Sequence, residues 1–124
     1  MLRVMLKSKI HRATVTEANL AYEGSLTIDQ DLMRAADILP YEMVHVFNIS
    51  NGERFQTYAM EGEAGSGVMC LNGAAARKGH AGDLIIVTTF ATYTADELKQ
   101  HVPKIVLVDA LNRIKEPRGI KKAS

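Results

Sequence analysis

The sequence contains one cysteine, Cys70, among 124 residues, so no disulfide can form within the chain. This usage is typical of a reducing compartment, and we expect a cytoplasmic protein. The apolar runs are far shorter than the roughly 20 residues that span a bilayer. The first seven residues carry too much charge for a signal peptide. We therefore expect neither a membrane protein nor an exported one.

The chain also lacks an excess of one charge. Its 15 basic and 14 acidic residues give a formal net charge of +1. Dedicated nucleic-acid-binding proteins normally carry a stronger basic excess, so we expect no nucleic-acid partner. Basic residues gather only after Asn112, which favours a mobile tail over about 112–124. Length and composition predict a single domain over residues 1–124.

Motifs for metals and phosphates are absent as well. The four histidines do not show the spacing of a zinc site, and a lone cysteine adds no ligand pair. Gly62, Gly65 and Gly67 lack the spacing and the lysine of a phosphate-binding loop. Cys70 has no local signature of a thiol nucleophile, so a small buried side chain is the preferred interpretation. We expect no metal.

What the sequence does contain is a series of short β-strand patterns separated by turn signals. The pair Asn51-Gly52 predicts a two-residue hairpin, because both positions of a type I′ turn need positive φ. The glycine-rich segment 62–67 predicts a loop. Many short strands at close spacing indicate a small β-barrel or sandwich. The expected strands cover residues 2–7, 13–16, 43–49, 54–60, 68–71, 84–90 and 104–109.

Helix signals are few. Asp29 is a good N-cap for a helix over residues 30–37, which Pro40 keeps from continuing. Thr94 and Glu97 form a capping-box pattern that predicts a short helix near residues 95–101. The sequence therefore predicts a mainly β domain with two short helices.

The dipeptide Gly24-Ser25 has two interpretations. In the first it is a turn, because glycine tolerates positive φ and serine bends or caps the backbone. In the second it is a self-cleavage site, where the Ser25 hydroxyl attacks the preceding carbonyl. Gly24 suits that chemistry, since it has no Cβ to block the approach and permits a strained backbone. The dipeptide alone favours the turn.

Further polar segments favour the cleavage interpretation over the turn, because together they resemble the pyruvoyl-dependent aspartate 1-decarboxylases. The resemblance covers the chain from Leu2 to about Phe90, with the motifs in the family's order. Phe47 stands where that family often has tryptophan. The motifs are Lys9-Ile10-His11-Arg12, Tyr22-Glu23-Gly24-Ser25, Ile28-Asp29-Gln30-Asp31, Asn51-Gly52-Glu53-Arg54-Phe55, Thr57-Tyr58-Ala59, Asn72-Gly73-Ala74-Ala75-Ala76 and Gly82-Asp83-Leu84-Ile85-Ile86.

The resemblance implies a six-stranded double-psi β-barrel that assembles as a homotetramer with sites between neighbouring subunits. It implies cleavage between Gly24 and Ser25, with Ser25 becoming a pyruvoyl group that forms a Schiff base with the substrate. That group would take the place of pyridoxal phosphate. The implied reaction is decarboxylation of L-aspartate to β-alanine for pantothenate and coenzyme A synthesis. Whether a helper protein assists maturation is left open.

The resemblance also gives roles to individual residues. Tyr58 is the implied proton donor, and its reference pKa of about 10 keeps a phenol protonated at neutral pH. Thr57 and Asn72 are candidate donors to the oxyanion formed during cleavage. Arg54 and Lys9 are candidates for binding the substrate carboxylates, with Arg54 preferred for its bidentate guanidinium. The remaining substrate-binding candidates are His11, Gly73, Ala74 and Ala75.

Two other functions fit the residues less well. A non-catalytic small β-barrel that binds a ligand or nucleic acid through its basic tail would explain each polar residue separately, as a strand end, a turn or a packed side chain. A pyruvoyl decarboxylase of a related acid such as glutamate would share the cleavage and differ in pocket length.

Overall fold

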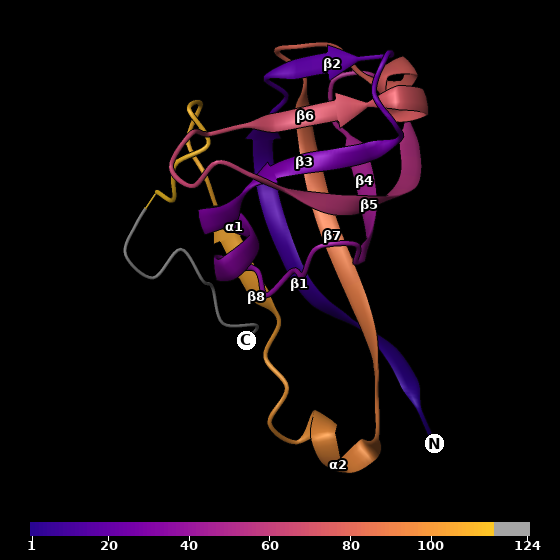
Figure 1. Ribbon diagram of the computed structural model, residues 1–124. Coiled ribbons are helices and arrows are strands. Elements are labelled where there is room, and N and C mark those ends of the chain that lie inside the picture. Colours follow the sequence, from indigo (N-terminus) through magenta and orange to yellow (C-terminus); the bar gives the residue numbers. More distant parts are fainter. Residues whose placement is uncertain (116–124) are drawn as a thin grey trace.

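Residues 1–115 are described by the computed structural model, in which eight strands form one mixed sheet (Figure 1). The sheet order is β2-β6-β3-β5-β4-β7-β1-β8. The strands are β1 (Arg3–Thr14), β2 (Glu17–Asn19), β3 (Ser25–Asp29), β4 (Met43–Asn48), β5 (Arg54–Gly62), β6 (Met69–Asn72), β7 (Leu84–Tyr93) and β8 (Lys104–Leu107). The helices are α1 (Gln30–Ala35), the 3₁₀ helix η1 (Gly73–Lys78) and α2 (Ala95–Leu98).

The sheet curls on itself, so that β3, β5 and β6 cross in front of β1 and β7 (Figure 1). Hydrogen bonds between Thr16 and Met69 join the chain after β1 to β6: the Thr16 amide donates to Met69 O at 2.8 Å, and the Met69 amide to Thr16 Oγ1 at 2.9 Å. The enclosed core is aliphatic, with fully buried side chains such as Ile10, Leu26 and Val87. Burial of these side chains supplies most of the driving force for folding.

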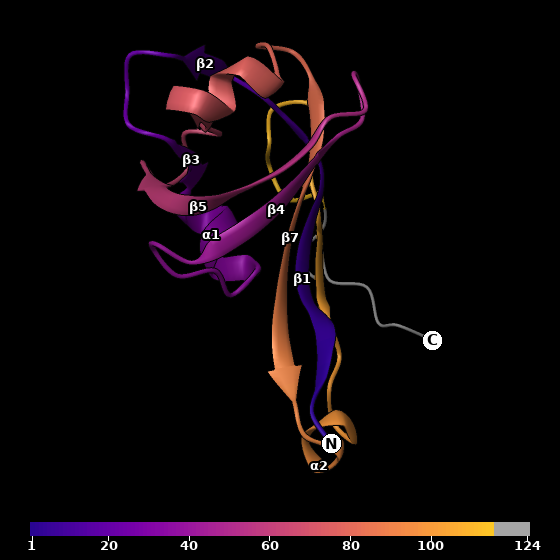
Figure 2. The ribbon, with the colours of Figure 1, turned by 90° about the vertical axis from the view of Figure 1, so that its right-hand side faces the viewer.

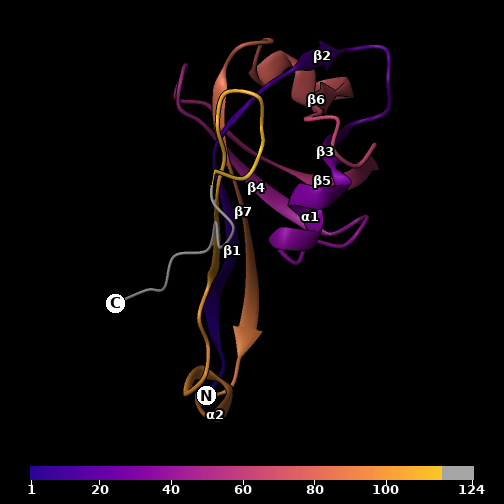
Figure 3. The ribbon, with the colours of Figure 1, turned by 90° about the vertical axis from the view of Figure 1, so that its left-hand side faces the viewer.

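A long ribbon of β1 and β7 extends beyond the curled part of the sheet (Figures 2 and 3). The antiparallel pairing of these strands runs from Arg3–Tyr93 to Thr14–Leu84, with two irregularities in register. Helix α2 lies at the tip of the ribbon, next to the N-terminus. No helix within residues 1–115 is long and apolar enough to cross a membrane.

The expected mainly β architecture with two short α-helices is confirmed. Both predicted caps are present: Asp29 accepts the Asp31 amide, and Thr94 and Glu97 form the capping box. The sheet has eight strands among the described residues, where the resemblance implies six, and the additional short strands β2 and β8 lie at its two edges.

The turn between β4 and β5 differs from the prediction. A two-residue hairpin is wrong here, because residues 49–53 separate the strands. Gly52 alone of the Asn51-Gly52 pair has positive φ, at 79°. The Asn48 side chain explains the wider loop, since its Oδ1 accepts the amides of Ser50 and Asn51 and holds the chain open.

The start of the predicted tail is packed against the sheet. Asn112 is 2% exposed, and its side chain bonds to both backbone groups of Thr14 and to Gly67 O. Val108 and Ile114 form a further antiparallel bridge. The rest of the predicted tail, residues 116–124, lies outside the described residues.

Candidate active site

Four side chains form a cluster on one face of the β3–β6 pair. The antiparallel register sets Ser25 opposite Asn72 and Thr27 opposite Cys70. Because side chains alternate between the faces of a sheet, all four project to the same side. Ser25, Cys70 and Asn72 are buried. The register therefore places the predicted nucleophile beside a side-chain amide.

The Asn72 amide connects the members of this cluster. Its Nδ2 donates to Ser25 Oγ at 3.0 Å and to Thr27 Oγ1 at 2.8 Å. Its Oδ1 accepts from Cys70 Sγ at 3.1 Å. The sequence predicts that Asn72 donates to the oxyanion; in the structure its amide contacts the Ser25 hydroxyl itself.

Gly73 forms the wall behind the Gly24–Ser25 peptide bond. Its φ is +61°, and a Cβ built there would lie 2.6 Å from Gly24 N and 2.7 Å from Tyr22 O. Real Cβ atoms do not approach backbone this closely. Gly73 thus lets β6 continue directly against the segment that is expected to be cleaved.

Strand β5 brings Thr57 and Tyr58 to the other side of β3. The two strands are parallel, with Leu26 opposite Ala59. Continuing this register by one residue sets Tyr58, which follows Thr57, level with Ser25, the first residue of β3. Alternation then puts Tyr58 on the same face as Ser25. The ring of Tyr41 stacks on Tyr58, with centroids 6.2 Å apart.

Arg54 lies at the distant end of the same strand. Four residues of β-strand separate it from Tyr58, or roughly 13 Å. Its guanidinium is stacked on Phe47 on the neighbouring strand β4, 5.0 Å from the ring centroid. The guanidinium of the predicted carboxylate-binding residue therefore contacts β4, and its backbone lies at the other end of β5 from Tyr58.

Lys9 and His11 are also separate from Ser25. Both belong to β1, whose neighbours in the sheet are β7 and β8, whereas Ser25 is on β3. His11 lines a cavity of about 560 Å³ with Arg12 and Lys115. Burial, together with the charges of Lys9, Arg12 and Lys115, lowers the pKa of His11, and its Nδ1 is buried without a hydrogen-bond partner.

The remaining predicted residues lie next to the cluster, at the start of η1. Gly73 and Ala75 are buried, and Ala74 is exposed. Within residues 1–115, no group of three or more His, Cys, Asp and Glu side chains is arranged to hold a metal ion.

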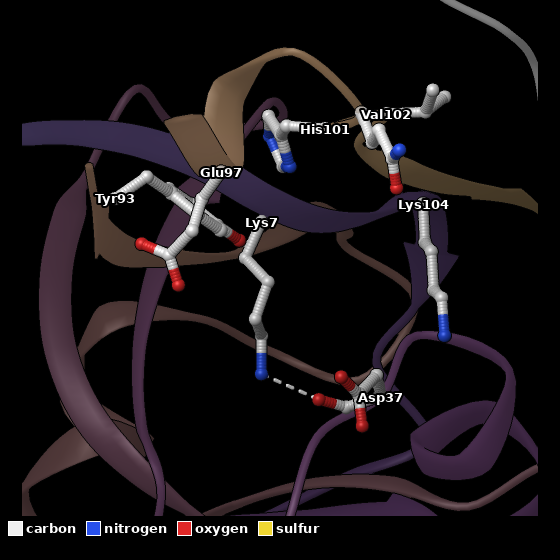
Figure 4. Close-up of a pocket in the computed structure, with 8 residues that line it drawn as sticks. Lys7, Asp37, Tyr93, Glu97, His101, Val102 and Lys104 are labelled. Atoms are coloured by element: carbon white, nitrogen blue, oxygen red, sulfur yellow. Dashed lines mark hydrogen bonds between the residues drawn. The ribbon is translucent and has the colours of Figure 1, made fainter. Parts of the chain in front are cut away.

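A second cavity, of about 320 Å³, lies elsewhere on the molecule and contains none of the predicted site residues (Figure 4). The cavity lies between α2 and the segment that follows α1. Lys7 reaches across it and donates to Asp37 O at 2.5 Å and to Glu42 Oε2 at 2.7 Å. Because the Lys7 ammonium is already paired with protein oxygens, this cavity is a weaker candidate for the active site.

Three features of the site were missed from the sequence. The strand over Ser25–Asp29 was not predicted, although buried Leu26 and Ile28 alternate with Thr27 and Asp29. Cys70 was interpreted only as a small buried side chain, and no sequence signal links it to Asn72 across a strand. Tyr41 likewise meets Tyr58 only through the fold.

The comparisons with known proteins decide the family. The model of the aspartate decarboxylase family matches residues 1–115. The chain belongs to this family. The resemblance carried by the sequence motifs is thereby confirmed, and with it the expectation of an enzyme of the decarboxylase class.

Individual relatives are similar in sequence to this chain over nearly their whole length. The chain is 68% identical to an aspartate 1-decarboxylase of Syntrophobacter fumaroxidans over 91% of both chains. It is 58% identical to one of Desulfotalea psychrophila, over 94% of this chain and 98% of that protein. It is 60% identical to one of Dehalococcoides mccartyi, over 89% of both.

Proposed function

We propose that this protein decarboxylates L-aspartate to β-alanine and carbon dioxide, supplying pantothenate and coenzyme A synthesis. Family membership over residues 1–115 and the names of the relatives support the reaction. The observation that carries the proposal is the contact of Asn72 Nδ2 with Ser25 Oγ, directly after Gly24. It prepares this serine, unlike an ordinary turn serine, for chemistry on the preceding peptide bond.

The first step is self-cleavage. Ser25 Oγ attacks the Gly24 carbonyl carbon, the C–N bond breaks, and the hydroxyl proton passes to the released nitrogen, which leaves an ester. A base then removes the Ser25 Cα proton, and the Gly24 carboxylate leaves from Cβ with the former Oγ. The dehydroalanine takes up water and loses ammonia, which gives a pyruvoyl group at residue 25. Thr57, which precedes Tyr58 on β5, is the candidate donor to the oxyanion.

The residues around position 25 fit such a group. The site is buried, and the Asn72 amide that donates to the hydroxyl can equally donate to a carbonyl oxygen. When formed, a pyruvoyl group supplies the electron sink for the pair left behind as carbon dioxide departs.

The other side chains of the site bind the substrate and supply a proton. Tyr58, level with Ser25, is the acid for the carbon that loses carbon dioxide. Gly73 and Ala75 give this region a close backbone wall. Arg54 is the candidate for the side-chain carboxylate of aspartate, since strong binding of the departing carboxylate would oppose its loss.

We further propose that the active protein is a homotetramer whose sites lie between neighbouring subunits. Support comes from the separation of Arg54, Lys9 and His11 from Ser25 within one chain. A neighbouring copy would supply these side chains to Ser25 and Tyr58. A helper for maturation and the cytoplasmic location stay predictions.

Ser25→Ala tests the proposed function. We expect the wild-type chain to split into a fragment ending at Gly24 and one beginning at residue 25, and to form β-alanine. The variant keeps the fold, because it loses only one hydroxyl, and both activities should disappear. Intact-mass spectra and β-alanine assays measure these outcomes. A wild-type chain that stays whole yet decarboxylates aspartate would overturn the self-cleavage.

The same assay distinguishes aspartate from related amino acids as the substrate. A longer pocket would favour glutamate, and comparison of kcat/KM for the two amino acids separates the possibilities. A non-catalytic barrel would form no product from either.

A further inference from the structure

We propose that Cys70 is a positioning residue for the cleavage of the Gly24–Ser25 bond. Its thiol proton fixes the orientation of the Asn72 amide, and that orientation directs an N–H group at Ser25 Oγ. The inference rests on the proposed self-cleavage and adds a residue to it.

The amide of Asn72 has two orientations of nearly equal shape. It offers two N–H donors on one side and a carbonyl oxygen on the other. In the structure both N–H groups are used, one by Ser25 Oγ and one by Thr27 Oγ1. The two hydroxyls do not select this orientation, since a hydroxyl can donate as well as accept. The selection must come from the group on the opposite side of the amide.

That group is the Cys70 thiol, whose Sγ lies 3.1 Å from Asn72 Oδ1. A thiol in its protonated form is a donor and only a weak acceptor. It therefore favours the carbonyl oxygen and disfavours the rotated amide, which would present N–H groups to sulfur. Cys70 is 5% exposed, so water does not readily replace it.

The thiol keeps its proton under ordinary conditions. Burial raises the pKa of Cys70, and the nearby carboxylate of Glu17 raises it further. Glu17 is placed beside Cys70 by the parallel β2–β6 pairing. The donor is therefore present across the neutral pH range.

The orientation matters for the attack itself. With N–H directed at Ser25 Oγ, the amide stabilises the negative charge that develops as the hydroxyl loses its proton. In the rotated amide, the hydroxyl would donate to Oδ1 and keep its proton in that bond. Without the thiol donor, the Asn72 amide can adopt the rotated orientation, and cleavage should therefore slow.

Cys70→Ala and Cys70→Ser test this role. The alanine variant loses the donor, and we expect first-order cleavage to slow by about fivefold, the factor for one ordinary hydrogen bond. The serine variant retains an O–H donor and should cleave within about twofold of wild type. Cleavage is followed by intact mass after rapid purification, with thermal denaturation measured on the uncleaved fraction.

The matched control is Ser8→Ala. It also removes one buried heavy atom and one side-chain hydrogen bond, here 2.5 Å to Thr89 Oγ1, but lies on β1 away from Ser25. It should lower the melting temperature and leave the cleavage rate unchanged. If Cys70→Ala does not fold, Cys70→Val and Cys70→Thr give the same comparison, with only threonine supplying a donor.

The outcomes separate the two proposals. A wild-type chain that never cleaves would overturn the proposed self-cleavage. A wild-type chain that cleaves, with the alanine variant equally fast or the serine variant equally slow, would overturn the role of Cys70 alone. Alanine slow and serine fast supports it, because a mere packing role would not distinguish the variants by their donor.

Discussion

At the scale of single residues, Gly73 packs against the backbone of Tyr22 and Gly24, directly before the proposed cleavage bond. Gly73→Ala would bring a methyl group to within 2.6 Å of Gly24 N, so the Tyr22–Gly24 segment must shift. Because the attack of Ser25 Oγ depends on the position of the Gly24 carbonyl, we expect cleavage to slow on the order of a hundredfold. Time courses of intact mass measure the effect.

Gly52→Ala is the control for this substitution. Gly52 has a φ of +79°, comparable to that of Gly73, but a Cβ there meets nothing within 4 Å. Gly52→Ala therefore carries the cost of a side chain at positive φ, about 1 kcal/mol, without a clash between the new methyl group and the backbone. Equal slowing by both substitutions would show that destabilisation, and not the contact with Gly24, controls cleavage.

At the scale of elements, the sequence was informative wherever a local signal acts within a few residues. The caps Asp29 and Thr94 were predicted correctly, because an N-cap bonds to amides two or three residues ahead. Strand β3 was missed, because it spans only five residues, of which only Leu26 and Ile28 are apolar, so its alternating pattern is weak. The contact of Asn72 with Ser25 spans 47 residues and depends on strand register, which no short motif encodes.

Asp29, the last residue of β3, joins this strand to α1 and to the β5–β6 loop. Its carboxylate accepts the amides of Asp31, Gly65 and Gly67 and is 2% exposed. Asp29→Ala would leave three amides without this partner, two of them in the β5–β6 loop. We expect the free energy of unfolding to fall by about 3 kcal/mol, measured by urea denaturation.

Asp96→Ala provides the comparison. Asp96 also lies in the first turn of a helix, but its side chain is 89% exposed and pairs only with Lys99. Its removal should cost about 0.5 kcal/mol or less. Similar losses for the two substitutions would contradict the joining role of Asp29.

At the scale of the whole molecule, one chain carries all the predicted residues but does not bring them together. The sequence motifs assign Arg54 and Lys9 to the same site as Ser25. The order of motifs along a chain, however, carries no information on the distances between their residues in the fold. The fold places Arg54 about 13 Å along β5 from Tyr58 and Lys9 on β1. Under the proposed assembly a second copy completes the site, a property that a single chain's sequence does not display.

Co-expression of Arg54→Ala and Ser25→Ala chains tests this division. The Arg54→Ala chain should cleave itself yet lack the substrate cation, and the Ser25→Ala chain should retain Arg54 but remain whole. Each alone should form almost no β-alanine. In randomly mixed oligomers about a quarter of the sites combine an intact Ser25 with a neighbour's Arg54, so activity should return to about a quarter of wild type. Mixed oligomers with cleaved Arg54→Ala chains and no activity would place the whole site within one subunit, since such a site is never restored by a neighbour.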